Sequence, residues 1–431
     1  MKYYSLNKQS PIVDFKQATI NGQAPDKGLY FPESIPVVNK ELIDNIEQYS
    51  NEEIAFRVIH PYTGNTIPEK DLQQIVAETV NFDIPLVRVT ENIFSLELFH
   101  GPTLAFKDTG ARFMSRCLGY FVKGNDKKIT VLVATSGDTG GAVANGFYDV
   151  EGVDVVILYP SGKVSSVQEQ QLTALGKNIR AIEVAGNFDD CQQLVKQAFT
   201  DTDINKKLFL TSANSINVAR WLPQQFYYFF AWKQWSGKTN PPVIAVPSGN
   251  FGNICAGILA YTSGLPVKHF IAACNANNTV PEFLQTDNYQ PKKAVATISN
   301  AMDVGNPSNF VRILELFHQQ LGDLKKVFSS YSISDDATKA AIKEVYSTYH
   351  YLPDPHGAVG YIALQKYLEE HPAEKGMFLE TAHPVKFYDV VEPIINEKVP
   401  VPASVAAILN SKKHAVKMGT AYQEFKEYLL A

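Results

Sequence analysis

From about residue 93 onward, short continuous apolar runs alternate with segments whose apolar residues recur at helical spacing. The predicted strand and helix pairs are Ile129–Ala134 with Gly140–Tyr148, Val153–Tyr159 with Ser165–Leu175, Ile179–Val184 with Phe188–Thr200, and Val243–Val246 with Gly252–Tyr261. Continuous apolar strands separated by helices are typical of parallel sheets that are covered on both faces. The pattern therefore predicts an α/β fold.

The beginning of the chain has a different pattern. Helix-like stretches near Asn39–Tyr49 and Glu69–Thr79 are flanked by segments rich in Pro and Gly. With 431 residues, the chain is longer than one hydrophobic core usually holds. We predict a small N-terminal domain (1–92), a first α/β domain (93–225), and a second α/β domain with C-terminal helices (226–431).

Composition and charge narrow the classes of function. Hydrophobic residues make up 45% of the chain and charged residues 19%, which is ordinary for a globular protein. The net charge of −5, without a long Lys/Arg cluster, argues against a nucleic-acid partner. We find no apolar stretch of membrane-spanning length and no signal region, so we expect a cytoplasmic protein.

Cysteine and histidine spacing gives no sign of a disulfide framework or a metal site. The cysteines are Cys117, Cys191, Cys255 and Cys274. They are widely separated, so we expect reduced thiols in the core. We assign no metal. The aromatic run Trp221–Phe230 has no interleaved basic residues and is therefore interpreted as core packing rather than as a base-stacking surface.

One lysine stands out at the junction between a strand and a helix. Lys107 follows the strand-like run Ile93–Phe99 and precedes a helix-like run from Gly110 to Val122, among small and apolar neighbours. Burial lowers the pKa of an amine, and a neutral amine can attack a carbonyl. The pattern favours a reactive lysine; the alternative is a solvated lysine at the start of a helix.

A second junction suits a phosphate group. The loop Gly249–Asn253 lies between the strand-like run Val243–Val246 and a helix-like segment, so its backbone N–H groups converge at a helix start. It lacks the Lys-Ser/Thr of a Walker A loop and the spacing of a dinucleotide fingerprint. An ordinary turn between strand and helix remains the alternative.

A third junction, Thr135–Gly141, carries several hydroxyl groups after a buried strand. Thr135, Ser136 and Thr139 are candidates to bind a carboxylate or phosphate. The string Gly137–Gly141 is similar to the nucleophile loop of trypsin-like proteases, but Thr139 stands where the serine would be, and the flanks predict a strand and a helix. All three loops follow strands, where ligands bind in parallel sheets.

Together these segments resemble the fold-type II pyridoxal-phosphate enzymes. More closely they resemble the threonine synthase family, of the longer-chain type with an extra N-terminal segment. The resemblance is carried by Gly28–Pro32, Phe99–Arg112, Ala134–Gly141, Asn214–Arg220, Val246–Gly252, Asn300–Val304 and Thr381–Pro384. It spans nearly the whole chain; Asn253 and Asp138 are small polar departures from the patterns of the family.

The resemblance implies two parallel-sheet α/β domains and a reaction that converts O-phosphohomoserine into threonine and phosphate. Pyridoxal 5'-phosphate would be the electron sink, and Lys107 would carry it as a Schiff base and shuttle protons. The implied cofactor contacts are Lys107, Gly249, Asn250, Phe251, Gly252, Asn253, Asp138 and Thr381. The implied substrate contacts are Thr135, Ser136, Thr139, Asn214, Ser215, Asn217 and Arg220. The implied enzyme is a monomer or homodimer acting on a small molecule.

Several alternatives stay open at this stage. Thr381 also fits a strand-end cap, and Arg220 fits a surface arginine on an N-capped helix. Lys163 fits either an addition to the phosphate site or, as we favour, a solvated helix-start lysine, and His356 fits a structural turn residue. A threonine dehydratase, or a β-replacement enzyme similar to cysteine synthase, would need no second phosphate site, so the segment Asn214–Arg220 discriminates against both. A non-catalytic binding protein would not need Lys107.

Overall fold

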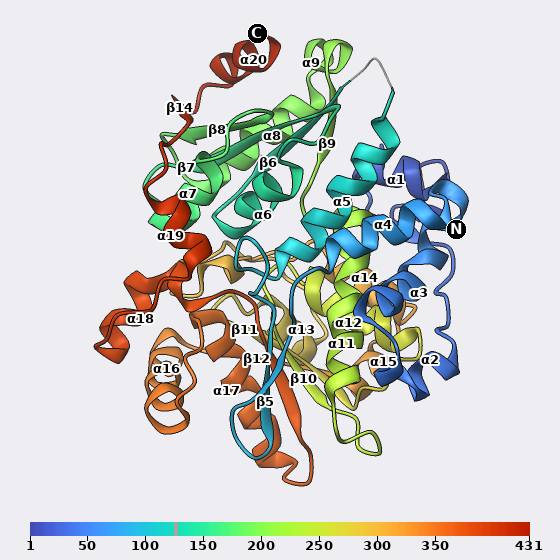
Figure 1. Ribbon diagram of the computed structural model, residues 1–431, viewed down its shortest axis with the longest axis vertical. Coiled ribbons are helices and arrows are strands. Elements are labelled where there is room, and N and C mark those ends of the chain that lie inside the picture. The colour runs from blue at the N-terminus through green and yellow to red at the C-terminus, as the bar shows by residue number, and fades with distance from the viewer. Residues whose placement is uncertain (125–127) are drawn as a thin grey trace.

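The computed structural model describes residues 1–124 and 128–431. Two sheets dominate it, one in the upper and one in the lower half of Figure 1. The upper sheet contains, in spatial order, β14 (Ala415–Met418), β8 (Ile179–Val184), β7 (Val153–Pro160), β6 (Ile129–Ala134) and β9 (Phe209–Ser212). The lower sheet contains β12 (Phe328–Ser332), β11 (His269–Cys274), β10 (Val243–Pro247), β13 (Gly376–Glu380), β5 (Ile93–Glu97) and β4 (Leu86–Arg88).

Every neighbouring pair in these two sheets is parallel except β4 and β5. The predicted α/β class with two parallel sheets is confirmed. The predicted strands have apolar side chains on both faces, and β6, β10, β11 and β13 are buried along their whole length. Burial on both faces is the physical reason why these strands read as continuous apolar runs.

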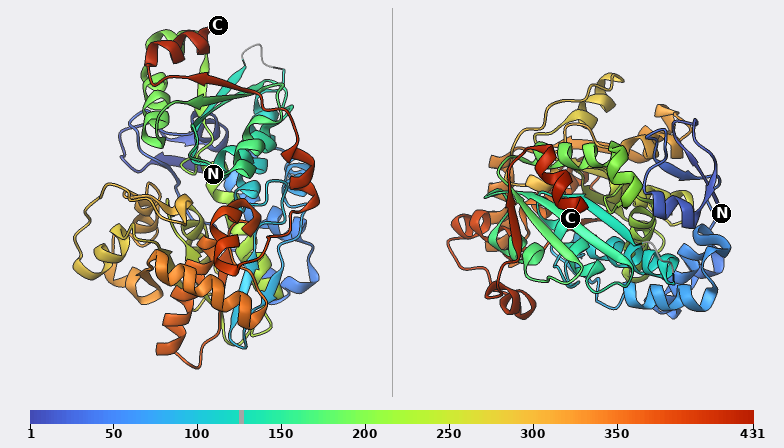
Figure 2. Two further views of the ribbon diagram at one scale, coloured as in Figure 1. Left: turned by 90° about the vertical axis from the view of Figure 1, so that its left-hand side faces the viewer. Right: turned by 90° about the horizontal axis from the view of Figure 1, so that it is seen from above.

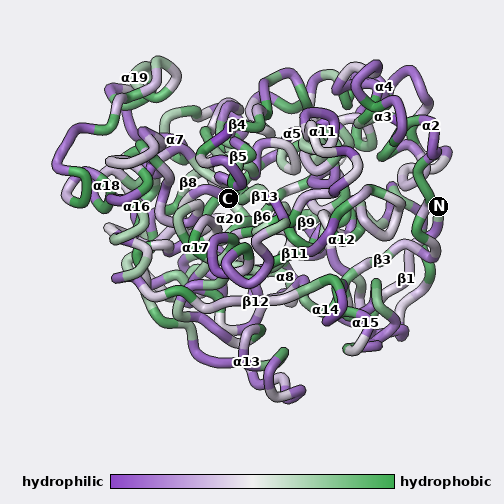
Figure 3. Tube along the Cα trace, turned by 90° about the horizontal axis from the view of Figure 1, so that it is seen from below, coloured by the Kyte–Doolittle hydropathy of each residue, from purple (hydrophilic) through white to green (hydrophobic). Residues whose placement is uncertain are grey.

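Helices surround both sheets. In the first part of the chain they are α1 (Phe15–Asn21), α2 (Lys40–Asp44), α3 (Asn51–Thr63), α4 (Glu69–Thr79), α5 (Lys107–Val122), α6 (Asp138–Phe147), α7 (Ser166–Thr173), α8 (Phe188–Thr200), α9 (Thr202–Lys207), α10 (Val218–Trp221) and α11 (Phe226–Gln234). The later helices are α12 (Gly252–Thr262), α13 (Thr279–Thr286), α14 (Phe310–Leu316), α15 (Leu321–Val327), α16 (Asp335–Tyr349), α17 (Pro355–Glu370), α18 (Tyr388–Ile395), α19 (Ala403–Leu409) and α20 (Tyr422–Leu430). Figure 3 shows hydrophobic and hydrophilic residues alternating along α3 and α4, as expected of helices that cover a core with one side.

The N-terminal segment contains a small antiparallel sheet that the sequence pattern did not predict. Its strands are β2 (Val13–Asp14), β1 (Lys2–Ser5) and β3 (Tyr30–Pro32), in this order. These strands are too short to show an alternating pattern. The predicted core role of the aromatic run Trp221–Phe230 is confirmed, because its side chains are buried.

Each of the two sheets contains a strand from the other half of the chain. β5, from the segment 93–225, pairs with β13 in the lower sheet, and β14, near the C-terminus, pairs with β8 in the upper sheet. Figure 2 shows the C-terminal helix α20 on the upper sheet, where it packs against α8 and α9. A division at residue 225 therefore does not separate the sheets, since parallel pairing joins strands that are distant in sequence.

The expectation of core thiols is confirmed: all four cysteines are free and buried. Within residues 1–124 and 128–431, no helix is long and apolar enough to cross a membrane.

Candidate active site

A cleft of about 1930 Å³ lies where several strands of the two sheets end. Of the site residues predicted from the sequence, those that line this cleft are Lys107, Thr135, Ser136, Asp138, Thr139, Asn214, Ser215, Arg220, Gly249, Asn250, Phe251, Gly252, Asn253 and Thr381. The loops after β6 and β10, the residue after β13 and the start of α5 thus converge on one cavity. This is the edge at which parallel sheets bind ligands.

Lys107 is the first residue of α5 and faces the cleft. The preceding loop is fastened to the lower sheet, because the Phe106 N–H donates to the Thr381 carbonyl over 2.9 Å. The Lys107 ammonium has no hydrogen-bond partner among the described residues. Burial lowers the pKa of Lys107, and the nearby Lys386 and Arg220 lower it further, while Asp138 opposes them. The lowered pKa increases the fraction of Lys107 that is a neutral, nucleophilic amine.

Asp138 begins α6 and is held in an ion pair that the sequence did not reveal. Its Oδ1 lies 2.8 Å from Nζ of Lys386 and accepts a hydrogen bond from Gln168 over 2.9 Å. Burial would raise the pKa of Asp138, but Lys386, Lys107 and Gln168 outweigh it and hold that pKa well below its usual range. Asp138 is therefore a carboxylate at the cleft. Nothing in the local pattern around Lys386 marks this lysine as buried.

The loop Gly249–Asn253 has the properties of a phosphate site. The N–H groups of these five residues have no hydrogen-bond acceptor among the described residues. Phe251 has a left-handed backbone (φ 62°) and anchors the turn by packing its ring against Phe310. A Cβ at Gly249 would lie 2.7 Å from Cα of Met302, so only glycine fits this close approach. Successive free amides at a helix start bind phosphate.

The side chains of this loop hold its shape. Asn250 donates to Oγ of Ser215 over 2.8 Å and accepts from the Ser308 N–H over 2.6 Å. Asn253 donates to the Pro247 carbonyl over 2.9 Å and accepts from the Ile254 N–H. The two amide side chains are thus engaged by the protein, and the backbone amides are left for the ligand.

Thr381 directly follows β13 and lines the cleft with a hydroxyl that has no hydrogen-bond partner in the described part of the chain. It is almost fully buried, at 6% exposure. A buried, unpaired hydroxyl is available to a polar atom of a ligand. The Lys107 amine, the free amides of 249–253 and this hydroxyl are the groups that pyridoxal phosphate needs for its aldehyde, phosphate and ring nitrogen, so the residues present fit the cofactor.

The hydroxyl groups after β6 divide into two roles. Oγ1 of Thr135 accepts from the N–H groups of Gly137 and Gly140 over 3.0 and 2.9 Å, so it shapes the loop. The hydroxyls of Ser136 and Thr139 have no partner among the residues that the structure describes and face the cleft. Ser136 and Thr139 are the better placed of the three for contact with a substrate.

The segment Asn214–Arg220 brings a buried guanidinium to the cleft. Nη1 of Arg220 donates to the Ala213 carbonyl, and Nε has no acceptor among the described residues. Burial lowers the pKa of Arg220 to about 10, which leaves it charged at neutral pH. Gly110 allows α5 to pack closely against Arg220, since a Cβ there would lie 2.6 Å from the Arg220 carbonyl oxygen and 3.1 Å from its Nε. Asn214 also faces the cleft with a free side chain.

Asn217 corrects the prediction from the sequence. It is fully buried and does not line the cleft. Its Oδ1 accepts from the Ala219 N–H over 2.9 Å and its Nδ2 donates to the Thr19 carbonyl over 2.9 Å. Asn217 is the N-cap of α10 and ties that helix to the N-terminal segment, so its role is structural.

Two further residues from the sequence analysis, Lys163 and His356, also line the cleft. Lys163 is exposed and lines its outer part. His356 is buried: its Nδ1 lies 2.5 Å from Asp354, and its Nε2 accepts from the Ala301 N–H over 3.2 Å. Because Nε2 accepts, the ring proton sits on Nδ1. His356 thus braces the loop beside Gly249, in keeping with a structural role.

Comparison with known proteins shows the family of the chain. Residues 83–379 match the family described as pyridoxal-phosphate dependent enzyme, residues 2–80 match the threonine synthase N terminus, and residues 357–429 match the threonine synthase C-terminal family. Threonine synthase from Haemophilus influenzae is 44% identical over 431 residues, covering 100% of both chains.

Two solved structures have the same fold over the whole chain. The structure of threonine synthase from Escherichia coli has a TM-score of 0.93 and 42% identity, covering 100% of this chain and 99% of that one. That of pyridoxal-phosphate-bound threonine synthase from Brucella melitensis has a TM-score of 0.92 and 35% identity, covering 100% and 98%. Fold and site together define a fold-type II enzyme that depends on pyridoxal phosphate. Within this class, the chain belongs to the threonine synthase family, and the resemblance found in the sequence is confirmed.

Proposed function

We propose that the protein converts O-phosphohomoserine and water into threonine and inorganic phosphate. The observation that carries the proposal is that Arg220 and Asn214 line the same cleft as the free amides of 249–253 and form a second candidate anion site there. One site would hold the cofactor phosphate, and the other, built by Arg220 and Asn214, would hold the phosphate of the substrate. A dehydratase acting on threonine has no phosphate to place in the second site.

The residues of the chain would divide the work as follows. Pyridoxal phosphate, when bound, supplies an electron sink for charge that develops on the substrate carbons. Lys107 would hold the cofactor and move protons between the substrate carbons, which a flexible amine of lowered pKa can do. The amides of 249–253 would hold the cofactor phosphate, Thr381 would face the ring nitrogen, and Asp138 would face the cofactor hydroxyl.

The substrate would be oriented at both ends. Ser136 and Thr139, which line the cleft beside the start of α6, would bind its carboxylate, and Arg220 would bind its phosphate. Breaking the Cγ–O bond releases phosphate; a solvent proton then completes the methyl group, and water adds its oxygen at Cβ. Together with the four free cysteines, this metabolic reaction supports a cytoplasmic location. We expect a monomer or homodimer.

Solvent isotopes test the reaction. In heavy-oxygen water, the threonine hydroxyl should carry solvent oxygen, and in deuterated water, the methyl group should carry deuterium. Phosphate release from O-phosphohomoserine should match threonine formation one for one. Mass spectrometry of the products decides the outcome. If 2-ketobutyrate and ammonia are the main products, the dehydratase alternative holds instead, and threonine without solvent oxygen excludes the proposed route.

A further inference from the structure

The candidate active site contains a second lysine, buried behind the wall of the cleft. Lys386 lies in the short 3-10 helix η5 (Pro384–Phe387), shortly after Thr381, and its side chain is 0% exposed. Its Nζ lies 2.8 Å from Oδ1 of Asp138 and 2.7 Å from the carbonyl oxygen of Thr103. It is not among the residues that line the cleft. An ammonium is costly to bury unless it is paired, and this one is paired twice.

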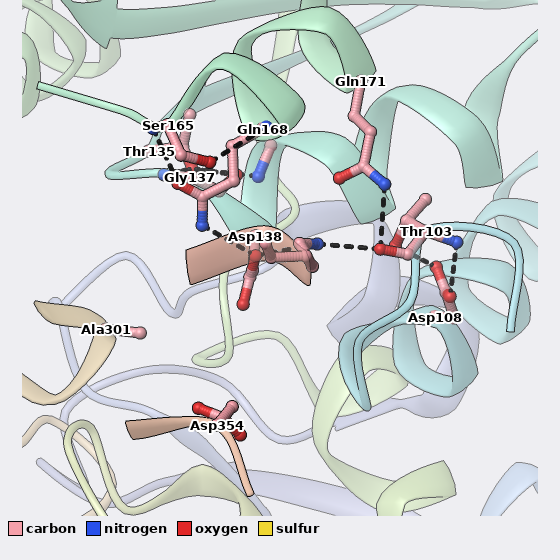
Figure 4. A network of polar contacts seen from close by, with 12 residues as sticks. Thr103, Asp108, Thr135, Gly137, Asp138, Ser165, Gln168, Gln171, Ala301 and Asp354 are labelled. Atoms are coloured by element: carbon pink, nitrogen blue, oxygen red, sulfur yellow. Dashed lines mark hydrogen bonds and ion pairs between the residues drawn. The ribbon is translucent and has the colours of Figure 1, made fainter. Parts of the chain in front are cut away.

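The contacts of Lys386 connect three segments that each supply a group to the cleft. Thr103 belongs to the loop before Lys107, Asp138 starts α6, and Lys386 itself follows Thr381. Figure 4 shows Asp138 and Thr103 close to each other, with dashed lines marking the polar contacts between them and their neighbours.

Both ends of the network are held by further hydrogen bonds. The Thr103 carbonyl also accepts from Gln171 over 3.0 Å, and the Thr103 N–H and hydroxyl donate to Asp108 over 2.8 and 2.6 Å. Gln168 holds Asp138 from the other side. The ammonium of Lys386 thus has one defined position in a rigid surround.

The electrostatic consequence concerns Lys107. The charges that act on the pKa of Lys107 are those of Asp138 on α6, Lys386 in η5 and Arg220 on α10. An unbalanced carboxylate at Asp138 would stabilise a positive charge on Lys107, since a nearby opposite charge favours the ionised form of an amine. In the ion pair, the positive charge of Lys386 offsets the negative charge of Asp138, so Asp138 stabilises a positive charge on Lys107 less strongly.

We propose that Lys386 is a positioning residue that fixes the Asp138 carboxylate at the cleft wall and balances its charge, so that Lys107 remains available as a neutral amine. The inference adds a residue to the proposed function, because it takes Lys107 as the cofactor lysine. Its test needs neither the substrate nor turnover, so the two proposals fail separately.

The test measures the protonation of Lys107 directly. The full-length protein, freed of cofactor, is labelled at a series of pH values with acetic anhydride, and the labelling rate of the peptide that contains Lys107 is followed by mass spectrometry. In Lys386→Met, the midpoint of the Lys107 labelling curve should rise by about one pH unit or more. Labelling below the midpoint should then be about tenfold slower than in the wild type. In Asp138→Asn, the midpoint should fall.

A double variant keeps the test decisive if Lys386→Met does not fold, since that change leaves Asp138 unpaired in the interior. Asp138→Asn with Lys386→Met carries no unpaired buried charge, and its midpoint should lie above that of Asp138→Asn alone. The matched control is Lys163→Met, which removes a positive charge from the outer cleft and should leave the midpoint in place. The proposal is overturned if Lys386→Met leaves the midpoint of the wild-type protein unmoved. It is also overturned if adding Lys386→Met to Asp138→Asn leaves the midpoint unmoved or lowers it.

Discussion

The N–H of Phe106 donates a hydrogen bond to the carbonyl oxygen of Thr381, and this 2.9 Å contact fastens the residue before Lys107 to the candidate partner of the cofactor ring. The two residues are far apart in the chain. They meet because β5 and β13 are parallel neighbours, with Glu97 opposite Glu380, so the chain leaves both strands at the same edge. The spacing between the lysine and the hydroxyl is therefore set by the sheet.

Lys107→Ala should abolish covalent attachment of pyridoxal phosphate and lower kcat by about a thousandfold or more, because the same amine holds the cofactor and moves protons. Borohydride reduction of the wild-type protein, followed by peptide mass spectrometry, should place the cofactor on the peptide that contains Lys107. Attachment to the Lys386 peptide would contradict the assignment.

Arg220→Ala should lower kcat/KM by about 30- to 1000-fold and leave the cofactor bound, since loss of a charged phosphate contact costs about 2–4 kcal/mol. Steady-state kinetics beside a visible spectrum measures both effects, and Arg220→Lys should recover part of the loss. Unchanged kinetics would remove Arg220 from the substrate site, and loss of cofactor absorbance would make its role structural.

Gly249→Ala should weaken cofactor binding by about tenfold or more, because the added Cβ would lie 2.7 Å from Cα of Met302 and push the 249–253 loop out of shape. Cofactor titration followed by absorbance measures the change. Gly322→Ala is the matched control, since a Cβ there has no neighbour within 4 Å. Equal affinities in the two variants would argue against the loop as the phosphate site.

Glu380→Gln should make the stability of the protein less dependent on pH. Burial raises the pKa of Glu380 well above its usual value, and the nearby Asp354 raises it further. The folded state therefore binds a proton that the unfolded state releases, and the stability this contributes is present below the unfolded pKa and lost as the pH rises toward the folded pKa.

Thermal unfolding at a series of pH values between 5 and 9 measures this effect. One proton changes the free energy of unfolding by at most about 1.4 kcal/mol per pH unit. The wild type should lose stability with rising pH more steeply than Glu380→Gln. The exposed Glu369→Gln should follow the wild type. If the stability of Glu380→Gln falls with pH as steeply as that of the wild type, Glu380 is ionised in the folded protein and the prediction is wrong.

Local pattern was sufficient for much of the fold. The apolar runs that became β6, β7, β8 and β10 were predicted because burial on both faces requires a continuous apolar sequence. The glycine-bearing loops after β6 and β10, and Lys107 at the start of α5, were found because a ligand site at a strand end needs small residues and free amides beside a helix start. These requirements act over a few neighbouring residues, so the sequence by itself determined them.

Tertiary structure decided what depends on residues distant in the chain. Asn217 has the residue type of a phosphate ligand, but packing of α10 turns it toward Thr19 and away from the cleft. Lys386 reads as an ordinary lysine and becomes buried because η5 folds onto Asp138 and Thr103. The places of β5 beside β13 and of β14 beside β8 depend on strand partners that are distant in the chain. A charge balance or a strand partner is a property of residues that meet in space, and only the folded chain brings them together.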